Sequence, residues 1–191
     1  MEDKAKKRKT SAESLLKSQK VDEYVMGWVV QLDEQVLFGP LPSNAADYYY
    51  LAQKGVTHIV NLKLSKWAEK KAKDKGFDVW DVPVPEEILQ DKIKEEAKAQ
   101  LYVAMAKKIQ SDMGKTTCVY LCFKDGVAEE AYVAFALWKL RNKKEKTDPL
   151  LWCKQNKQSQ VCKMAAEKDM MNRVWKQVKM QTEGIASFFV K

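Results

Sequence analysis

The sequence predicts an α/β fold, with a central, mostly parallel sheet flanked by helices and followed by extra C-terminal helices. Strand-like and helix-like segments alternate along the chain, an order typical of sheets covered by helices. Residues 116–122 (TTCVYLC) form a continuous apolar run, as expected for a strand at the centre of a covered sheet. A turn containing Gly126 then leads into an apolar helix. In such a fold, the amides of this turn and the helix N-terminus would form an anion site.

The domain is expected to open with a β-hairpin. Segments 26–32 and 35–38 are short β-branched and aromatic runs, separated by Asp33 and Glu34. Residues 39–43 (GPLPS) then break the second strand.

Two helix–strand pairs are expected next. Ser43 or Asn44 caps a helix that runs through Lys54 and is closed by Gly55, and residues 56–62 form a buried strand.

A charged surface helix over residues 66–75 ends at Gly76, and residues 77–84 return as a strand. Pro83 and Pro85 cannot donate to a sheet ladder, so we expect this strand at an edge of the sheet or these prolines at its end.

The second half of the domain is expected to be mainly helical. Residues 86–112 carry apolar side chains at helical spacing, with room for one break. After the strand at residues 116–122, we expect a helix over residues 127–140 and two more helices within residues 147–181. The end of the sequence is apolar, with Phe188, Phe189 and Val190.

Length and composition indicate one domain. The chain has 191 residues, of which 46% are hydrophobic and 31% charged, enough for a single substantial core. We divide it into a basic flexible tail (1–22), a domain (23–181) and a C-terminal tail (182–191).

No apolar run approaches the about 18 residues of a membrane span, and no secretory signal is evident. We therefore expect a soluble intracellular protein, cytoplasmic or nuclear and not secreted.

The cysteines do not indicate a metal site. Cys118, Cys122, Cys153 and Cys162 have no CxxC spacing, and the single histidine, His58, lies far from them in sequence. We expect no metal and no cofactor, reduced buried thiols, and a structural hydrogen bond for His58.

The positive net charge of +8 favours anionic partners. Part of it is concentrated in Lys6, Lys7, Arg8 and Lys9, a cluster near the N-terminus. This cluster could be a nuclear-import signal, an arm that contacts phosphates or another anionic partner, or a run that only solvates the tail.

Aromatic residues are mostly assigned to the core. We expect one or two rings of Tyr48, Tyr49 and Tyr50 to be buried and at least one to be exposed, because three successive residues spread around a helix. Trp138, Trp152 and Trp175 lie at core-like spacing in expected helices.

The order of these segments resembles a known family. Residues 36–42 (VLFGPLP), residues 55–62 (GVTHIVNL), the Val82-Pro83-Val84 segment and residues 119–121 (VYL) are similar to stretches of the dual-specificity protein phosphatases. The resemblance covers about residues 26–142. It implies the fold of the cysteine-dependent phosphatase superfamily, with the catalytic signature directly after the central strand.

The residues at the signature position depart from the family pattern of His-Cys, five residues, Arg, and Ser or Thr. They are Cys122, Phe123, Lys124, Asp125, Gly126, Val127, Ala128, Glu129 and Glu130. The resemblance therefore implies that Phe123 occupies the place of the nucleophilic cysteine and Glu129 that of the arginine that grips phosphate. The chain is expected to be a pseudophosphatase.

Two further comparisons with the family support inactivity. If Cys122 were the nucleophile in a loop shifted by one residue, Ala128 would fall at the arginine position, and burial should raise the pKa of this thiol. No aspartate stands at residues 84–87, where the family places its general acid. Glu86 and Glu87 are better explained as the acidic first turn of a helix.

The acids suggest why phosphate would not bind. Asp125, Glu129 and Glu130 surround the turn, and their charges would repel a phosphate dianion by about 1 kcal/mol or more for each close pair. The helix dipole and the loop amides should instead stabilise these acids. We expect a loop occupied by its own carboxylates.

Three functions follow in order of preference. The first is a catalytically inactive phosphatase-like protein that acts as a protein-binding or structural module. It would bind a protein partner or a second copy of itself, in an assembly that could be a virion, because degenerate domains of this family occur in large DNA viruses. The alternative is nucleic-acid binding through the basic surface and N-terminal arm. The least favoured is an active phosphatase that uses Cys122.

Overall fold

The central feature of the fold is a mixed five-stranded sheet in the order β1-β2-β5-β3-β4. The computed structural model describes residues 26–62, 66–123, 129–143, 151 and 168–183. β1 is antiparallel to β2, whereas β2, β5, β3 and β4 run parallel to one another. The predicted α/β class, with a mostly parallel sheet flanked by helices, is therefore confirmed.

The strands are short and fall within or close to the expected segments. They are β1 (Val30–Gln31), β2 (Val36–Pro40), β3 (His58–Asn61), β4 (Asp78–Asp81) and β5 (Val119–Phe123). β5 lies at the centre of the sheet, between β2 and β3, as its continuous apolar sequence predicts. β4 lies at the edge, which agrees with the two prolines that follow it.

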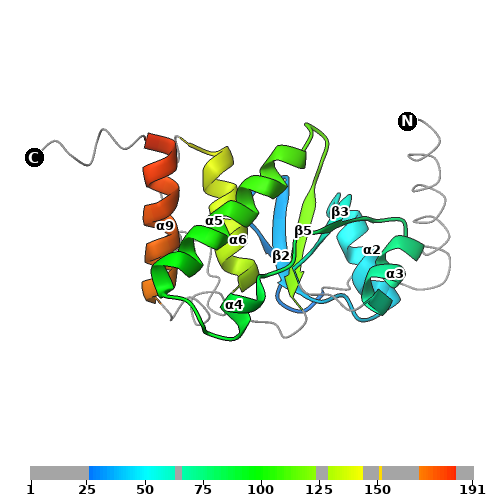
Figure 1. Ribbon diagram of the computed structural model, residues 1–191. Coiled ribbons are helices and arrows are strands. Elements are labelled where there is room, and N and C mark those ends of the chain that lie inside the picture. The colour runs from blue at the N-terminus through cyan, green and yellow to red at the C-terminus, as the bar shows by residue number, and fades with distance from the viewer. Residues whose placement is uncertain (1–25, 63–65, 124–128, 144–150, 152–167, 184–191) are drawn as a thin grey trace, which may run out of the picture.

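Helices cover both faces of this sheet (Figure 1). The described helices are α2 (Ala45–Gln53), α3 (Lys66–Asp74), α4 (Glu86–Leu89), α5 (Glu95–Asp112), α6 (Glu129–Arg141) and α9 (Lys168–Glu183). α2 and α3 lie on one side of the sheet, and α5 and α6 on the other. α9 packs on the outside of α5 and α6, so it adds a further layer and accounts for one of the expected C-terminal helices.

Each face of the sheet has its own apolar core. The larger core joins Phe38, Val60 and Leu121 to α5, α6 and α9, where Trp138 stacks on Trp175 at 6.5 Å between ring centroids. The smaller core lies against α2 and α3. Its sheet residues are Leu37, Ile59, Tyr120 and Cys122. Successive residues of β5 thus point into opposite cores, as strand geometry requires.

The predicted helix boundaries follow local capping signals. Asn44, one of the two residues proposed as the N-cap, caps α2 and forms a capping box with Asp47. Gly55 and Gly76 take φ values of +78° and +88° after α2 and α3. The long segment 86–112 does break, between α4 and α5, where Asp91 has a φ of 53°.

The prediction that residues 39–43 break the second strand was wrong for Gly39 and Pro40. Both belong to β2 and pair with Cys122 and Phe123 of β5. Gly39 is required there because a Cβ atom would lie 2.6 Å from the Tyr120 hydroxyl. That hydroxyl donates a 2.6 Å hydrogen bond to the Pro40 carbonyl, so a tertiary contact outweighs the local tendency of Gly-Pro to end a strand.

The expectation that one or two of the three consecutive tyrosines are buried is confirmed by Tyr48 and Tyr49. The third, Tyr50, is half-buried, whereas an exposed ring was expected. Trp138 and Trp175 lie in the core as predicted, whereas Trp152 is outside the described residues.

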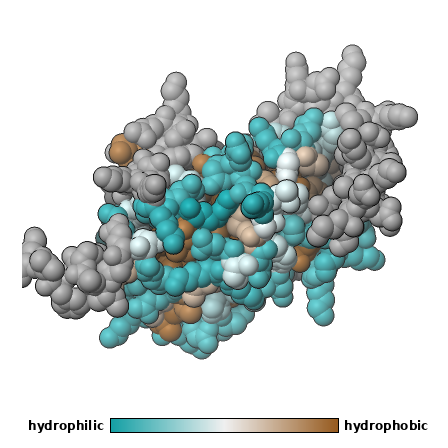
Figure 2. Space-filling view, turned by 90° about the horizontal axis from the view of Figure 1, so that it is seen from above, coloured by the Kyte–Doolittle hydropathy of each residue, from teal (hydrophilic) through white to brown (hydrophobic). Residues whose placement is uncertain are grey.

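On the face seen in Figure 2, hydrophilic residues cover most of the described surface, with smaller apolar areas between them. Within the described part of the chain, every helix is too short or too polar to cross a membrane. The N-terminal tail, most of the segment before α9 in which the other C-terminal helix was expected, and the apolar end of the sequence (188–190) all lie outside the described residues.

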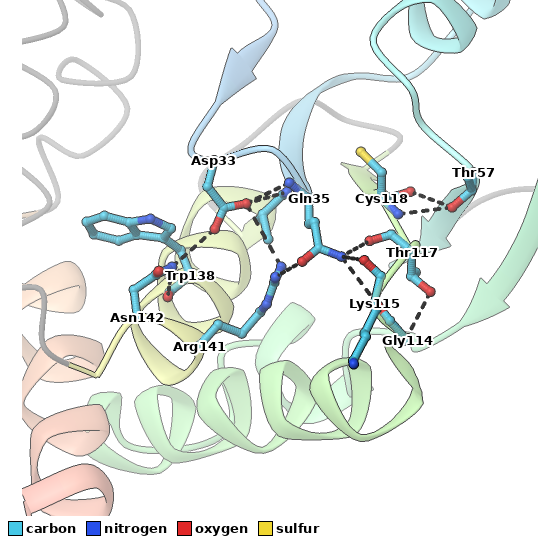
Figure 3. Close-up of polar contacts among 11 residues, drawn as sticks. Asp33, Gln35, Thr57, Gly114, Lys115, Thr117, Cys118, Trp138, Arg141 and Asn142 are labelled. Atoms are coloured by element: carbon cyan, nitrogen blue, oxygen red, sulfur yellow. Dashed lines mark hydrogen bonds and ion pairs between the residues drawn. The ribbon is translucent and has the colours of Figure 1, made fainter.

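A polar network ties the hairpin to the segment that enters the central strand (Figure 3). The side-chain amide nitrogen of Gln35 donates to three carbonyl oxygens at 3.3, 3.0 and 2.7 Å, those of Gly114, Lys115 and Thr117. The backbone carbonyl oxygen of Gln35 accepts from the Val119 amide at 2.8 Å. One residue therefore fixes where β5 begins relative to β2.

The end of α6 joins the same network. Arg141 donates to the side-chain oxygen of Gln35, and its guanidinium lies 3.9 Å from the Asp33 carboxylate. Asp33 also accepts from Asn142 at 3.1 Å and from the amides of Gln35 and Val36 at 2.8 and 2.9 Å. These contacts lie at the amino ends of the parallel strands and anchor α6 by its last turn.

Replacing Gln35 tests the importance of this network for stability. Gln35→Ala removes the donor to three carbonyls and the acceptor for Arg141, so the free energy of unfolding should fall by about 2 kcal/mol. The measurement is urea unfolding followed by circular dichroism. Gln100→Ala, at an exposed site on α5, is the matched control and should change the value by less than about 0.5 kcal/mol. Equal losses in the two variants would contradict this role for Gln35.

Candidate functional site

The candidate site lies where the central strand leads into α6, at the carboxyl ends of the parallel strands. β5 ends at Phe123 and α6 begins at Glu129. Four of the nine residues at the predicted signature position are described, of which the side chains of Cys122, Glu129 and Glu130 can be placed. Lys124, Asp125, Gly126, Val127 and Ala128 lie outside the described residues.

Cys122 is fully buried in the core shared by the sheet, α2 and α3. Burial raises the pKa of this thiol well above its ordinary value, and the nearby Glu130 carboxylate raises it further. Burial and nearby negative charges likewise raise the pKa of Tyr120, another buried residue of β5. Cys122 is therefore held as a neutral thiol, in agreement with the expectation from its apolar strand.

Glu130, in the first turn of α6, is the most unusual residue of the site. It has no exposed surface, and neither of its carboxylate oxygens has a hydrogen-bond partner among the described residues. Desolvation raises its pKa from 4.5 to about 8, and the half-buried Glu129 acts in the same direction. The backbone amide of Glu130 acts in the opposite direction and lowers the pKa, although it is not placed to form a hydrogen bond with the carboxylate. Glu130 is therefore protonated at neutral pH.

This finding corrects part of the sequence-based expectation. We predicted that the helix dipole and loop amides would stabilise the acids of the loop in their charged form. For Glu130 the cost of burial outweighs the dipole, because charge–dipole interactions contribute up to about 2 kcal/mol, whereas burial of an ionised carboxylate costs more. The sequence held one signal for this burial, because α6 is apolar on all sides. Its residues from Glu130 to Leu140 are all buried.

The neighbouring strand ends carry polar residues that bond to each other. The Asn61 amide donates to the Asp81 carboxylate at 2.8 Å, which joins the ends of β3 and β4. Glu86 and Glu87 are exposed in the first turn of α4, directly after its N-cap, Pro85. The helix-start interpretation of these two glutamates is confirmed.

The other residues singled out from the sequence do not join this site. His58 contacts the Thr57 hydroxyl at 2.7 Å and Asp78 at 3.6 Å, and its ring lies 4.3 Å from that of Trp80, so its contacts are structural as predicted. Among the described residues, no three His, Cys, Asp or Glu side chains are arranged to hold a metal ion. Cys153 and Cys162 lie outside those residues.

The basic cluster Lys6, Lys7, Arg8 and Lys9 also lies outside the described residues. Compared with protein-family models, curated proteins and solved structures, the chain matches none of them. Its relationship to the dual-specificity phosphatases therefore stays a prediction, supported by its own residues.

The raised pKa of Glu130 predicts an unusual pH dependence of stability. Because the folded state holds a proton up to about pH 8 and the unfolded state releases it near pH 4.5, the contribution of Glu130 to stability should be fully present below pH 4.5. It should then be lost as the pH rises to about 8. Glu130→Gln keeps the shape of the side chain and removes the titration, so at pH 9 it should be roughly 2–4 kcal/mol more stable than the parent.

The measurement is the free energy of unfolding in urea, for the parent and the variant, from pH 4.5 to pH 9. The two proteins should differ little at the acid end. Glu87→Gln, which removes an exposed first-turn acid, is the matched control and should follow the parent curve. Parallel curves for the parent and Glu130→Gln would show that Glu130 does not titrate as inferred.

Proposed function

We propose that this protein is a catalytically inactive phosphatase-like protein that acts as a protein-binding or structural module. The proposal is supported by the parallel strands β2, β5, β3 and β4, with the candidate loop following the central strand. It is also supported by the resemblance of residues 36–42 and 55–62 to the dual-specificity phosphatases. A mostly parallel sheet flanked by helices is the coarse fold that the family resemblance implies.

The observation that carries the proposal is the pair of glutamates at the start of α6. In an active relative this turn would present an arginine and free amides to a phosphate group. Here the helix begins with Glu129 and Glu130, and the second of these is buried without a hydrogen-bond partner among the described residues. A phosphate dianion would meet negative charge or a desolvated carboxyl in place of that arginine. Phosphate binding is therefore disfavoured, not merely phosphate hydrolysis.

The thiol chemistry supports the same conclusion. By resemblance, Phe123 occupies the position of the nucleophile, and Cys122, the neighbouring thiol, is buried with a raised pKa. A neutral buried thiol is a poor nucleophile because the thiolate is the reactive species. A shift of the loop by one residue would not supply the missing arginine, since Ala128 stands at that position.

Because the loop lacks the residues for phosphate hydrolysis, the proposed role of the fold is binding. A protein partner or a second copy of the chain is proposed, within a larger assembly for which a virion is one candidate. Affinity capture from native material with the full chain, followed by the stoichiometry of the recovered complex, tests for a partner. Sedimentation of the purified chain over a range of concentrations tests for self-association. A monomer that recovers no stoichiometric partner from native material would contradict the proposal.

The inactivity of the loop is tested by turnover and by binding. The parent should hydrolyse a generic aryl phosphate no faster than buffer, and Cys122→Ser should leave that background unchanged. Millimolar phosphate, and a phosphotyrosine peptide, should neither release heat on titration nor raise the melting temperature, because glutamates stand where a phosphate-gripping arginine would be needed.

Two outcomes would overturn this interpretation in different ways. Turnover that is abolished by Cys122→Ser would indicate an active enzyme with Cys122 as the nucleophile, in the loop shifted by one residue. Phosphopeptide binding at micromolar affinity that is abolished by Lys124→Glu, which reverses a positive charge within the loop, would show that the loop does hold phosphate.

A further inference from the structure

Trp67 is an exposed tryptophan among the lysines of α3. This helix lies on the opposite side of the sheet from α5 and α6 (Figure 1). Trp67 keeps 67% of its surface exposed, although the described tryptophans Trp28, Trp80, Trp138 and Trp175 are half-buried or buried. An indole side chain gains stability from burial, and an exposed one offers a large, rigid aromatic face to another molecule.

The residues around Trp67 form one face of the helix. Lys70 and Lys71 lie three and four positions after Trp67, and Lys66 lies four before Lys70, so the four side chains share a face. We call this set, Lys66, Trp67, Lys70 and Lys71, the α3 surface. Ala68 and Ala72 are buried on the other side of the helix, which therefore presents the α3 surface outward.

Lys71 holds the indole in place. Its ammonium lies 4.8 Å from the centre of the Trp67 ring and 5.9 Å from that of Tyr48, and it donates a 2.5 Å hydrogen bond to the Ser43 carbonyl. These contacts connect α3 to the segment before α2. Trp67 is therefore a positioned aromatic group with a cation beside it.

The lysines on either side of Trp67 are placed to contact an anionic partner. Lys66 and Lys70 are exposed, and neither forms an ion pair within the described part of the chain. Glu69, the acid within this stretch, is instead paired with Lys73 at 2.5 Å, on a neighbouring face of the helix. The α3 surface is thus cationic, in a chain whose net charge is already +8.

We propose that the α3 surface binds single-stranded nucleic acid. An exposed aromatic ring on which a base can stack, together with lysines that contact the phosphates, is the combination by which proteins bind single strands without reading their sequence. The α3 surface includes no residue of the loop before α6, so its role does not depend on the proposed loss of phosphatase activity. It gives a specific location to the nucleic-acid-binding alternative that the net charge suggested.

Two other anionic occupants fit this surface less well. A helix that lies in a membrane interface needs a broad apolar face, and the apolar side of α3, with Ala68 and Ala72, is already buried against the protein. An acidic peptide could pair with the lysines, but its carboxylates offer no planar group for the exposed indole. A nucleobase supplies such a group and its phosphate supplies the charge.

Fluorescence anisotropy of a labelled oligouridylate and a labelled oligothymidylate, each about 20 nucleotides long, tests the proposal with the full chain. Trp67→Ala should weaken binding by about five- to a hundredfold, because stacking of one base contributes about 1–3 kcal/mol. It should leave the salt dependence unchanged. Trp67→Phe should retain much of the affinity. Each variant should unfold within about 0.5 kcal/mol of the parent, since the side chain is exposed.

The double variant Lys66→Gln, Lys70→Gln should reduce the slope of log affinity against log salt by about 1.4, because each phosphate that is no longer neutralised by a lysine lowers the slope by about 0.7. Its matched control is Lys107→Gln, Lys176→Gln, which removes the same charge from exposed sites on α5 and α9. The control should retain most of the affinity and most of the slope.

The proposal is overturned by any of four results. One is an unchanged affinity in Trp67→Ala. Another is an equal loss in the control pair, which would show that net charge alone attracts the oligonucleotide. The third is binding of polyglutamate, or of vesicles with anionic lipid, that is as strong and as dependent on Trp67 as oligonucleotide binding.

A full-length variant with Lys6, Lys7, Arg8 and Lys9 changed to Gln distinguishes binding by the N-terminal arm from binding by the α3 surface. Loss of binding in that variant alone assigns the contact to the arm and overturns the role of α3.

Discussion

The contacts of the Gln35 side chain hold together the three segments on which the central strand depends. Gln35 donates to carbonyls just before β5, accepts from Arg141 at the end of α6, and leads directly into β2. These segments are distant in sequence and meet at the amino ends of the strands. Because α6 is anchored there by its last turn, its first turn is carried to the carboxyl ends of the strands. The position of Glu129 and Glu130 in the fold follows from this arrangement.

The buried glutamate gives the site its chemical character. A helix N-terminus after a central parallel strand is ordinarily a favourable place for an anion. Here that place is occupied by the carboxyl group of Glu130, which burial keeps protonated at neutral pH. The site therefore places side chains that oppose an anion at the start of a helix that follows a central parallel strand. This combination is the basis for proposing a binding role in place of phosphate chemistry.

Much of the fold could be predicted because it depends on local signals. The hairpin around Asp33, the capping of α2 by Asn44 and the glycines that end α2 and α3 each involve a few adjacent residues. The errors arose where distant residues decide. Gly39 remains in a strand because Tyr120, from the central strand, packs against it and bonds to Pro40. Tyr50 is half-buried, where an exposed ring was expected, because it packs against the core under α2.

For the candidate site, the sequence by itself determined that the central apolar segment ends in a thiol and a phenylalanine, and that two glutamates follow after five further residues. It also determined that α3 is short and rich in lysine. Only the tertiary structure decided that Glu130 is buried without a hydrogen-bond partner among the described residues, that Cys122 is inaccessible, and that Trp67 is exposed. The physical reason is that periodicity shows which face of an element is apolar, whereas ionisation and exposure depend on what packs against that face.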